Sequence, residues 1–174
     1  MPVLRGWRVL LIPAFFLLAG CGLTQTVTDG AVDVTKSIFY KKIKVLHLDF
    51  TPRKASNADG DQIPLATMVR VYQLKDSKTL ESADYPSLLR DGDKVLKEDL
   101  LESKSLLVMP QGSVSLNMPM HEEAKFVAVV ALFNRPDLTD NRWRLLLTRN
   151  DLDPDYPRVV ELGEGTLSLL PVKE

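Results

Sequence analysis

Alternating apolar and polar positions dominate the chain from about residue 44 onward. Residues 44–50, 67–74 and 142–148 each alternate with a period of two, and the third segment would bury Trp143. This period is typical of strands with one buried face. Residues 126–133 are apolar at every position, which predicts a central strand covered on both faces.

Two further pairs of segments are predicted to form hairpins. Residues 105–109 and 113–118 flank Pro110-Gln111-Gly112, which is typical of a tight turn. Residues 158–162 and 166–170 flank a glycine-rich turn and close the chain. Together with the other segments, these pairs predict a mainly β protein built as a two-sheet β-sandwich of about eight strands.

Residues 76–97 depart from this pattern. Leu80, Ala83 and Leu88 recur at roughly helical spacing, and Asp76 or Ser77 is suited to cap a helix. Pro86 is expected to divide the segment into two short helices. We therefore expect a β-sandwich domain over residues 43–174 with a helical insertion at about 76–97.

The first twenty residues have the features of an export signal. Arg5 and Arg8 precede an apolar run at residues 9–18, which is too short to span a bilayer comfortably. The run ends in Leu-Ala-Gly-Cys at residues 18–21, which resembles the bacterial lipobox, in which lipid is transferred to the cysteine thiol and cleavage makes that cysteine the first residue. The alternative is an ordinary signal peptide with a stray cysteine.

The lipobox resemblance implies a lipoprotein signal peptide at residues 1–20 and a lipidated Cys21. Residues 21–42 would then be the lipidated cysteine and a tether. Gly22 stands where an aspartate usually signals retention in the inner membrane, so the resemblance implies an anchor in the outer membrane with the domain facing the periplasm. Several acyl chains make such anchoring durable.

Composition and charge then reduce the number of function classes that fit the chain. Lys and Arg total 22 against 23 Asp and Glu, and basic residues are mixed with acidic ones, which argues against nucleic-acid binding. One cysteine and two histidines, His47 and His121, leave little for metal or nucleophilic chemistry. We expect no enzyme, no catalytic or metal site, and no cofactor beyond covalent lipid on Cys21.

The segment between the first two predicted strands is unusually long. Residues 51–65 number fifteen, whereas hairpin loops usually have two to five. Its prolines and Gly60 prevent a continued strand, and its polar middle cannot be buried. Long loops in small domains are often functional, so this segment is the candidate binding site.

Four local motifs carry a family resemblance. Residues 69–74 (VRVYQL), 83–91 (ADYPSLLRD), 132–135 (LFNR) and 142–144 (RWR) resemble, in this order, the TssJ lipoproteins of type VI secretion. The resemblance runs from about residue 44 to 170 and includes the lipobox. It implies a transthyretin-like sandwich with an added helical element.

The resemblance also implies a function and partners. Members of this family tether the trans-envelope secretion complex to the outer membrane by binding the periplasmic C-terminal region of TssM, and through TssM they join a membrane complex with TssL. The loop between the first two strands contributes to that contact. The candidate partner-binding residues are therefore Pro52, Arg53, Lys54, Ala55, Ser56, Asn57, Ala58, Asp59, Gly60, Asp61, Gln62 and Ile63.

This loop contains no aromatic residue, so its contact would depend on Arg53, Lys54, Asp59, Asp61 and Ile63. Two other functions stay open at this point. A lipoprotein with the same sandwich could carry a small apolar ligand, which requires a lined cavity. A periplasmic hydrolase would require a catalytic cluster drawn from His47, His121 and distant aspartates.

Overall fold

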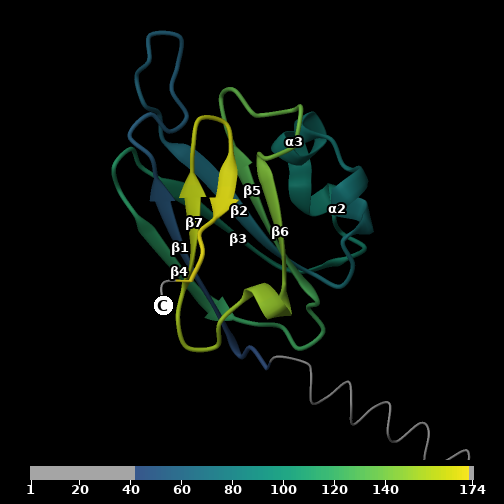
Figure 1. The fold of residues 1–174 in the computed structure, drawn as a ribbon. Helices are drawn as coiled ribbons and strands as arrows, with labels where there is room; N and C mark the ends of the chain where they lie inside the picture. The colour runs from purple at the N-terminus through teal and green to yellow at the C-terminus, as the bar shows by residue number, and fades with distance from the viewer. Residues whose placement is uncertain (1–41, 173–174) are drawn as a thin grey trace, which may run out of the picture. The chain divides into compact units, whose positions relative to one another are not determined.

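The computed structural model describes residues 42–172, which form two four-stranded sheets packed face to face (Figure 1). The predicted signal peptide, Cys21 and almost all of the tether lie outside the described residues. In the described part of the chain, no helix has the length and apolar character needed to cross a membrane.

The first sheet has the strand order β4-β1-β7-β8. Its strands are β1 (Val45–Pro52), β4 (Val114–Pro119), β7 (Arg158–Leu162) and β8 (Leu167–Leu169). Strand β1 lies antiparallel to β4 and parallel to β7. Strands β7 and β8 form the predicted closing hairpin.

The second sheet has the order β3-β2-β5-β6, and all its neighbouring strands are antiparallel. Its strands are β2 (Thr67–Leu74), β3 (Leu100–Val108), β5 (Phe126–Leu132) and β6 (Arg144–Thr148). The predicted two-sheet β-sandwich of about eight strands is confirmed. A short 3-10 helix, η1 (Arg149–Asp151), follows β6.

The hairpin predicted around residues 110–112 is wrong. Strand β3 pairs with β2 in the second sheet, whereas β4 pairs with β1 in the first, so the segment after Met109 crosses between sheets. The turn itself is present, with the Gly112 N–H donating to the Met109 carbonyl at 3.0 Å. Alternation marks which face of a strand is buried but not which strand it pairs with, since both strands face the same core.

The core lies between the two sheets. Leu46, Leu48 and Phe50 of β1 are fully buried, as the alternation predicts, and they face an inner layer that includes Val71 and Val129. The outer face of β1 and β4 is polar instead. There, Asp49 accepts a hydrogen bond from Ser115 at 2.5 Å, and this face is in contact with solvent.

The helical insertion is confirmed as two short helices, α2 (Lys78–Ser82) and α3 (Tyr85–Val95). Pro86 lies in the first turn of α3, so the break falls just before it, where the Asp84 side chain caps α3 by accepting from the Ser87 N–H at 2.9 Å. The helices cover part of the outer face of the second sheet (Figure 1). Strand β5 is thus buried on both faces, as its continuous apolar run predicts.

Two arginines of the second sheet hold the helices in place. Arg70 of β2 donates to the Leu88 carbonyl of α3 at 2.8 Å. Arg144 of β6 donates to the carbonyls of Leu80 and Glu81 in α2, and burial lowers the pKa of its guanidinium. The Arg144 head group therefore binds backbone carbonyls at the C-terminal end of α2, while the neighbouring Trp143 is buried in the core.

Candidate partner-binding surface

The segment between β1 and β2 projects beyond the sheets at one end of the sandwich (Figure 1). It is an ordered hairpin, closed by an isolated bridge between Ala58 and Pro64. The Asp59 carboxylate accepts from the backbone N–H groups of Asp61 and Ile63, both at 2.9 Å. Asp59 therefore shapes the tip of the loop, in the manner of an Asx turn.

The base of the loop is buried and centred on Asn57. Its backbone has φ 51°, a left-handed conformation that asparagine tolerates better than most residues. The Asn57 side chain donates to the Ala66 carbonyl at 3.1 Å and accepts from the Asn134 N–H at 2.6 Å. These bonds attach the loop both to the start of β2 and to the segment between β5 and β6.

Arg53 joins the loop to the first sheet. The Arg53 guanidinium forms an ion pair with Glu161 of β7 at 2.6 Å. The backbone N–H of Arg53 donates to the Leu162 carbonyl at 2.8 Å. The hydrogen bond to Glu161 raises the pKa of Arg53 above its ordinary value. Because the Arg53 side chain is largely exposed, this pair contributes little to stability, but it holds the side chain beside the loop.

The segment between β5 and β6, residues 133–143, packs beside this loop. The Asp137 N–H donates to the Gly165 carbonyl of the β7–β8 turn at 3.0 Å. Gly165 has φ 73°, and a Cβ there would lie 2.1 Å from the Arg135 carbonyl oxygen, so this contact requires glycine. A Cβ at Gly60 would lie 3.8 Å from the Arg135 guanidinium, which places that cation next to the loop tip.

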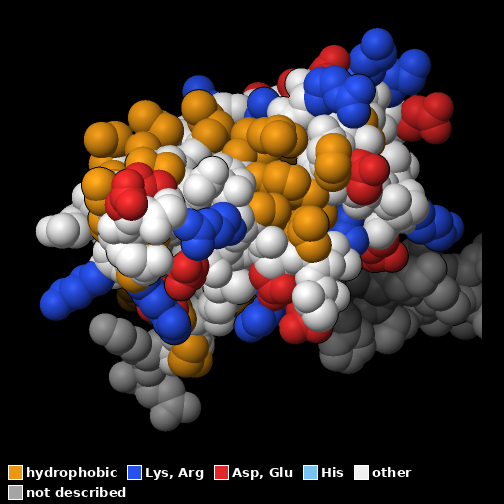
Figure 2. All heavy atoms as spheres, turned by 90° about the horizontal axis from the view of Figure 1, so that it is seen from above, with side chains coloured by type: hydrophobic (Ala, Val, Ile, Leu, Met, Phe, Trp, Pro, Cys, Tyr) orange, Lys and Arg blue, Asp and Glu red, His pale blue; other side chains and the backbone are white. Residues whose placement is uncertain are grey.

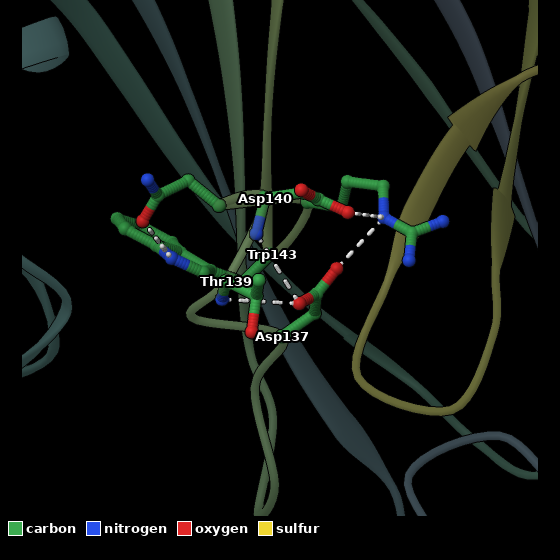
Figure 3. A network of polar contacts seen from close by, with 6 residues as sticks. Asp137, Thr139, Asp140 and Trp143 are labelled. Carbon is green, nitrogen blue, oxygen red and sulfur yellow. Dashed lines mark hydrogen bonds and ion pairs between the residues drawn. The ribbon is translucent and has the colours of Figure 1, made fainter.

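A network of polar contacts stabilises residues 137–143 internally (Figure 3). The Asp137 carboxylate accepts from the Thr139 N–H at 3.2 Å and pairs with Arg142 at 2.7 Å. The bond from Arg142 holds the pKa of Asp137 below its usual value. The Trp143 indole donates to the Asn141 amide oxygen at 3.2 Å. Residues 137–143 therefore hold a defined conformation beside the β1–β2 loop.

The structure divides the twelve candidate residues by exposure. Ser56, Asn57 and Ala58 are buried and give the loop its shape, while Pro52 and Asp59 are half-buried. The remaining seven are exposed and could meet a partner directly. They are Arg53, Lys54, Ala55, Gly60, Asp61, Gln62 and Ile63.

Loop length pointed to residues 51–65 but gave no indication of residues 133–143. Asn134, Arg135 and Asp137 join the surface only through tertiary contacts.

Within residues 42–172, no group of three His, Cys, Asp or Glu side chains is placed to hold a metal ion. His47 lies on the polar outer face, within 2.5 Å of the Asn117 amide oxygen.

This sandwich, with its helical insertion and projecting loop, matches a family of secretion lipoproteins. Residues 44–165 match the T6SS-SciN family, described as type VI secretion lipoproteins (VasD, EvfM, TssJ). The chain belongs to this family. Among curated proteins, no match was found.

Solved structures agree with the family. A chain in the structure described as the T6SS protein TssM C-terminal domain from EAEC is 44% identical, with a TM-score of 0.69, covering 75% of this chain and 100% of that one. A chain of a type VI membrane complex is also 44% identical, with a TM-score of 0.71 and the same coverage. Serratia marcescens Lip, a membrane-bound component of the type VI secretion system, has the same fold at 23% identity, with a TM-score of 0.64 over 74% of this chain and 98% of Lip.

Proposed function

We propose that this lipoprotein tethers a type VI membrane complex to the outer membrane by binding the periplasmic C-terminal region of TssM through the β1–β2 loop. The observation that carries this proposal is the loop's construction, with a buried base at Asn57 and an exposed tip at residues 60–63. A partner that meets such a preformed tip loses little loop entropy on binding. The 44% identity to a chain in the TssM C-terminal domain structure supports the choice of partner.

The loop residues have three separate roles in this proposal. Arg53, Lys54 and Asp61 offer charges at the rim of the contact, where they affect the association rate and its salt dependence more than the affinity. Ile63 is 56% exposed and offers apolar area. The buried residues Ser56 to Ala58 act indirectly by fixing the tip.

The membrane anchor in this proposal is lipid on Cys21, inserted in the inner leaflet of the outer membrane. The domain then faces the periplasm, and the described chain starts at Lys42, at the end of β1 opposite the loop. This polarity directs the loop away from the point at which the tether enters the domain. TssM, an inner-membrane protein, would connect the domain to TssL. Many copies acting together would provide avidity beyond one modest interface.

The family is a structural component of the secretion system, and we propose a mechanical function without catalysis.

One observation favours a second candidate, a carrier of small apolar molecules. Tyr156, Pro157, Leu170 and Val172 help to line an open groove of about 700 Å³. Because Tyr156 is 72% exposed, this groove would shield a ligand poorly. A retained ligand in native mass spectrometry would support the carrier.

Calorimetry with the TssM C-terminal domain from the same bacterium tests the tethering function. The purified full chain is compared with a variant in which residues 59–63 become a Gly/Ser segment of equal length. We expect binding by the unchanged chain and at least tenfold weaker binding by the variant. A control variant replaces the exposed Glu122 and Glu123 with Ser, at the opposite end of β1.

The outcomes separate partner from site. Absence of binding by the unchanged chain contradicts the TssM assignment. Equal binding by the loop variant keeps the partner and rules out the tip as its contact site. The substitution spares Asn57 and Arg53, so the loop base and the ion pair with Glu161 stay in place.

A further inference from the structure

The outer face of the second sheet ends in an apolar row that the helices leave uncovered. The strand register places Met68 of β2 between Leu107 of β3 and Leu132 of β5. Two residues further along β2, Arg70 binds the Leu88 carbonyl, so α3 covers the sheet from that point. Beyond the helix, Met68 is 38% exposed and Leu107 is 49% exposed.

This row continues into the β1–β2 loop. Met109 follows β3 directly, and Ile63 and Leu65 precede β2, with exposures of 54%, 56% and 37%. Figure 2 looks down on the end of the sandwich from which the loop projects and shows a band of hydrophobic side chains there. We name the set Ile63, Leu65, Met68, Leu107 and Met109 the apolar surface.

The outer faces of β1 and β4 in the other sheet differ from this row. On β1 and β4, polar outward side chains bond to one another, as with His47 and Asn117 or Asp49 and Ser115. Contiguous apolar exposure on a soluble domain often marks a binding surface. The uncovered apolar row of the second sheet is therefore a candidate binding surface.

We infer that the apolar surface extends the contact of the β1–β2 loop and receives an uncharged, apolar segment of the same TssM domain. This inference rests on the proposed function and adds a second part to its site. The loop tip supplies the polar rim, and the apolar surface supplies the centre. Such a division between an apolar centre and a polar rim is usual for protein interfaces.

The size of the loop supports this extension. A stable protein interface involves about 20–30 residues on each side, whereas the loop offers seven exposed positions between residues 52 and 63. The apolar surface is continuous with the loop through Leu65, and none of its five residues is charged. A partner segment placed across it would need no buried counter-charge.

The position of the apolar surface favours the protein partner over the bilayer. It lies at the Pro52 end of β1, whereas the chain enters the domain from Lys42 at the other end. Eight strand residues separate the two ends by about 25 Å. A domain tethered through Lys42 would place the apolar surface on the side away from that attachment.

Calorimetry with the TssM C-terminal domain tests this inference on three variants of the full chain. L107E and M68E each place a charge in the apolar surface, and we expect each to weaken binding at least tenfold. Y156E adds the same charge at a residue that is 72% exposed near the Lys42 end, and we expect binding equal to that of the unchanged chain. Equal melting temperatures establish that all three variants are folded.

Three results would overturn the inference while the proposed function stands. The first is unchanged affinity of both L107E and M68E. The second is self-association of the unchanged chain that L107E abolishes without affecting TssM binding, which would assign the surface to a second copy. The third, which needs no variant, is absence of added hydrogen-exchange protection at residues 105–109 in the complex. Failure of the unchanged chain to bind contradicts the proposed function itself, and the inference with it.

Discussion

The backbone N–H of Asn134 donates to the side-chain oxygen of Asn57 at 2.6 Å, across 77 positions of sequence. This bond connects the β1–β2 loop to the segment that follows β5. Asn57 is 5% exposed, and its side-chain NH₂ group donates a hydrogen bond to the Ala66 carbonyl. This buried amide thus helps to determine where the exposed tip lies relative to the sheets.

Replacing Asn57 with Ala is expected to lower the free energy of unfolding by about 1–3 kcal/mol, because it leaves the Asn134 N–H and the Ala66 carbonyl without partners. It should also weaken TssM binding although Asn57 is buried, since the tip loses its support. Urea denaturation and calorimetry on the same protein measure the two effects.

Asn57→Gly separates the two contributions to this loss. Glycine removes the same hydrogen bonds but adopts φ 51° without strain, whereas alanine does not. We expect Asn57→Gly to be more stable than Asn57→Ala by about 1 kcal/mol. Equal stability of the two variants would mean that the left-handed conformation contributes nothing.

A second prediction concerns the contact between α3 and β2. A Cβ at Gly92 would lie 2.2 Å from the Tyr72 hydroxyl oxygen, so Gly92→Ala must displace either the helix or the ring. We expect a loss of about 1–3 kcal/mol in the free energy of unfolding. The Tyr72 hydroxyl is buried without a well-formed hydrogen bond, and burial raises its pKa.

Tyr72→Phe is the matched test of this clash. On its own it should be nearly neutral, since the oxygen that it removes makes no well-formed hydrogen bond within residues 42–172. In combination with Gly92→Ala it should recover part of the loss. Additive effects in this double-mutant cycle, measured by urea denaturation, would show that the destabilisation has another origin.

The sequence specified the strands better than their pairing. Alternation identified the buried faces of β1 and β2, because burial depends on the residue type at every second position. It could not place β3 and β4 in different sheets, since pairing depends on the connection after Met109. The role of Arg144 was likewise hidden, because its carbonyl acceptors lie more than 60 residues earlier in the chain.

The candidate site was predictable in part for the same reason. Loop length is a local property, and it pointed to residues 51–65. Which of them are exposed depends on contacts with distant segments, such as that between Asn57 and Asn134. The exposed row at Met68 depends on where α3 ends over the sheet, which no local pattern indicates.

The stability that the segment beside the loop, residues 133–143, gives to the fold is expected to fall at low pH. The pKa of Asp137 is lowered chiefly by Arg142, so its ionised form stabilises the folded state. This stabilisation is complete above the ordinary aspartate pKa of about 3.9 and is lost as the pH falls through the lower folded-state pKa. Asp137→Asn should therefore lower the melting temperature at pH 7 and have little effect near pH 2.

Thermal unfolding of both proteins from pH 2 to pH 7 measures this difference. Asp61→Asn is the control, because Asp61 is an exposed loop carboxylate for which no ion pair is present among the described residues. A difference between Asp137→Asn and the unchanged chain that stays constant across this range would contradict the assigned role of the carboxylate.

Cys21→Ser tests the tether separately from the fold. Cys21 lies outside the β-sandwich domain predicted from residue 43, so the variant should unfold at the same urea concentration as the unchanged chain. Without the thiol that accepts lipid, we expect it to leave the outer-membrane fraction and to abolish secretion. Its purified domain should still bind TssM with unchanged affinity, because the proposed contact lies at the other end of β1. Secretion at normal levels by a correctly exported, unlipidated variant would contradict tethering, even if TssM binding persisted.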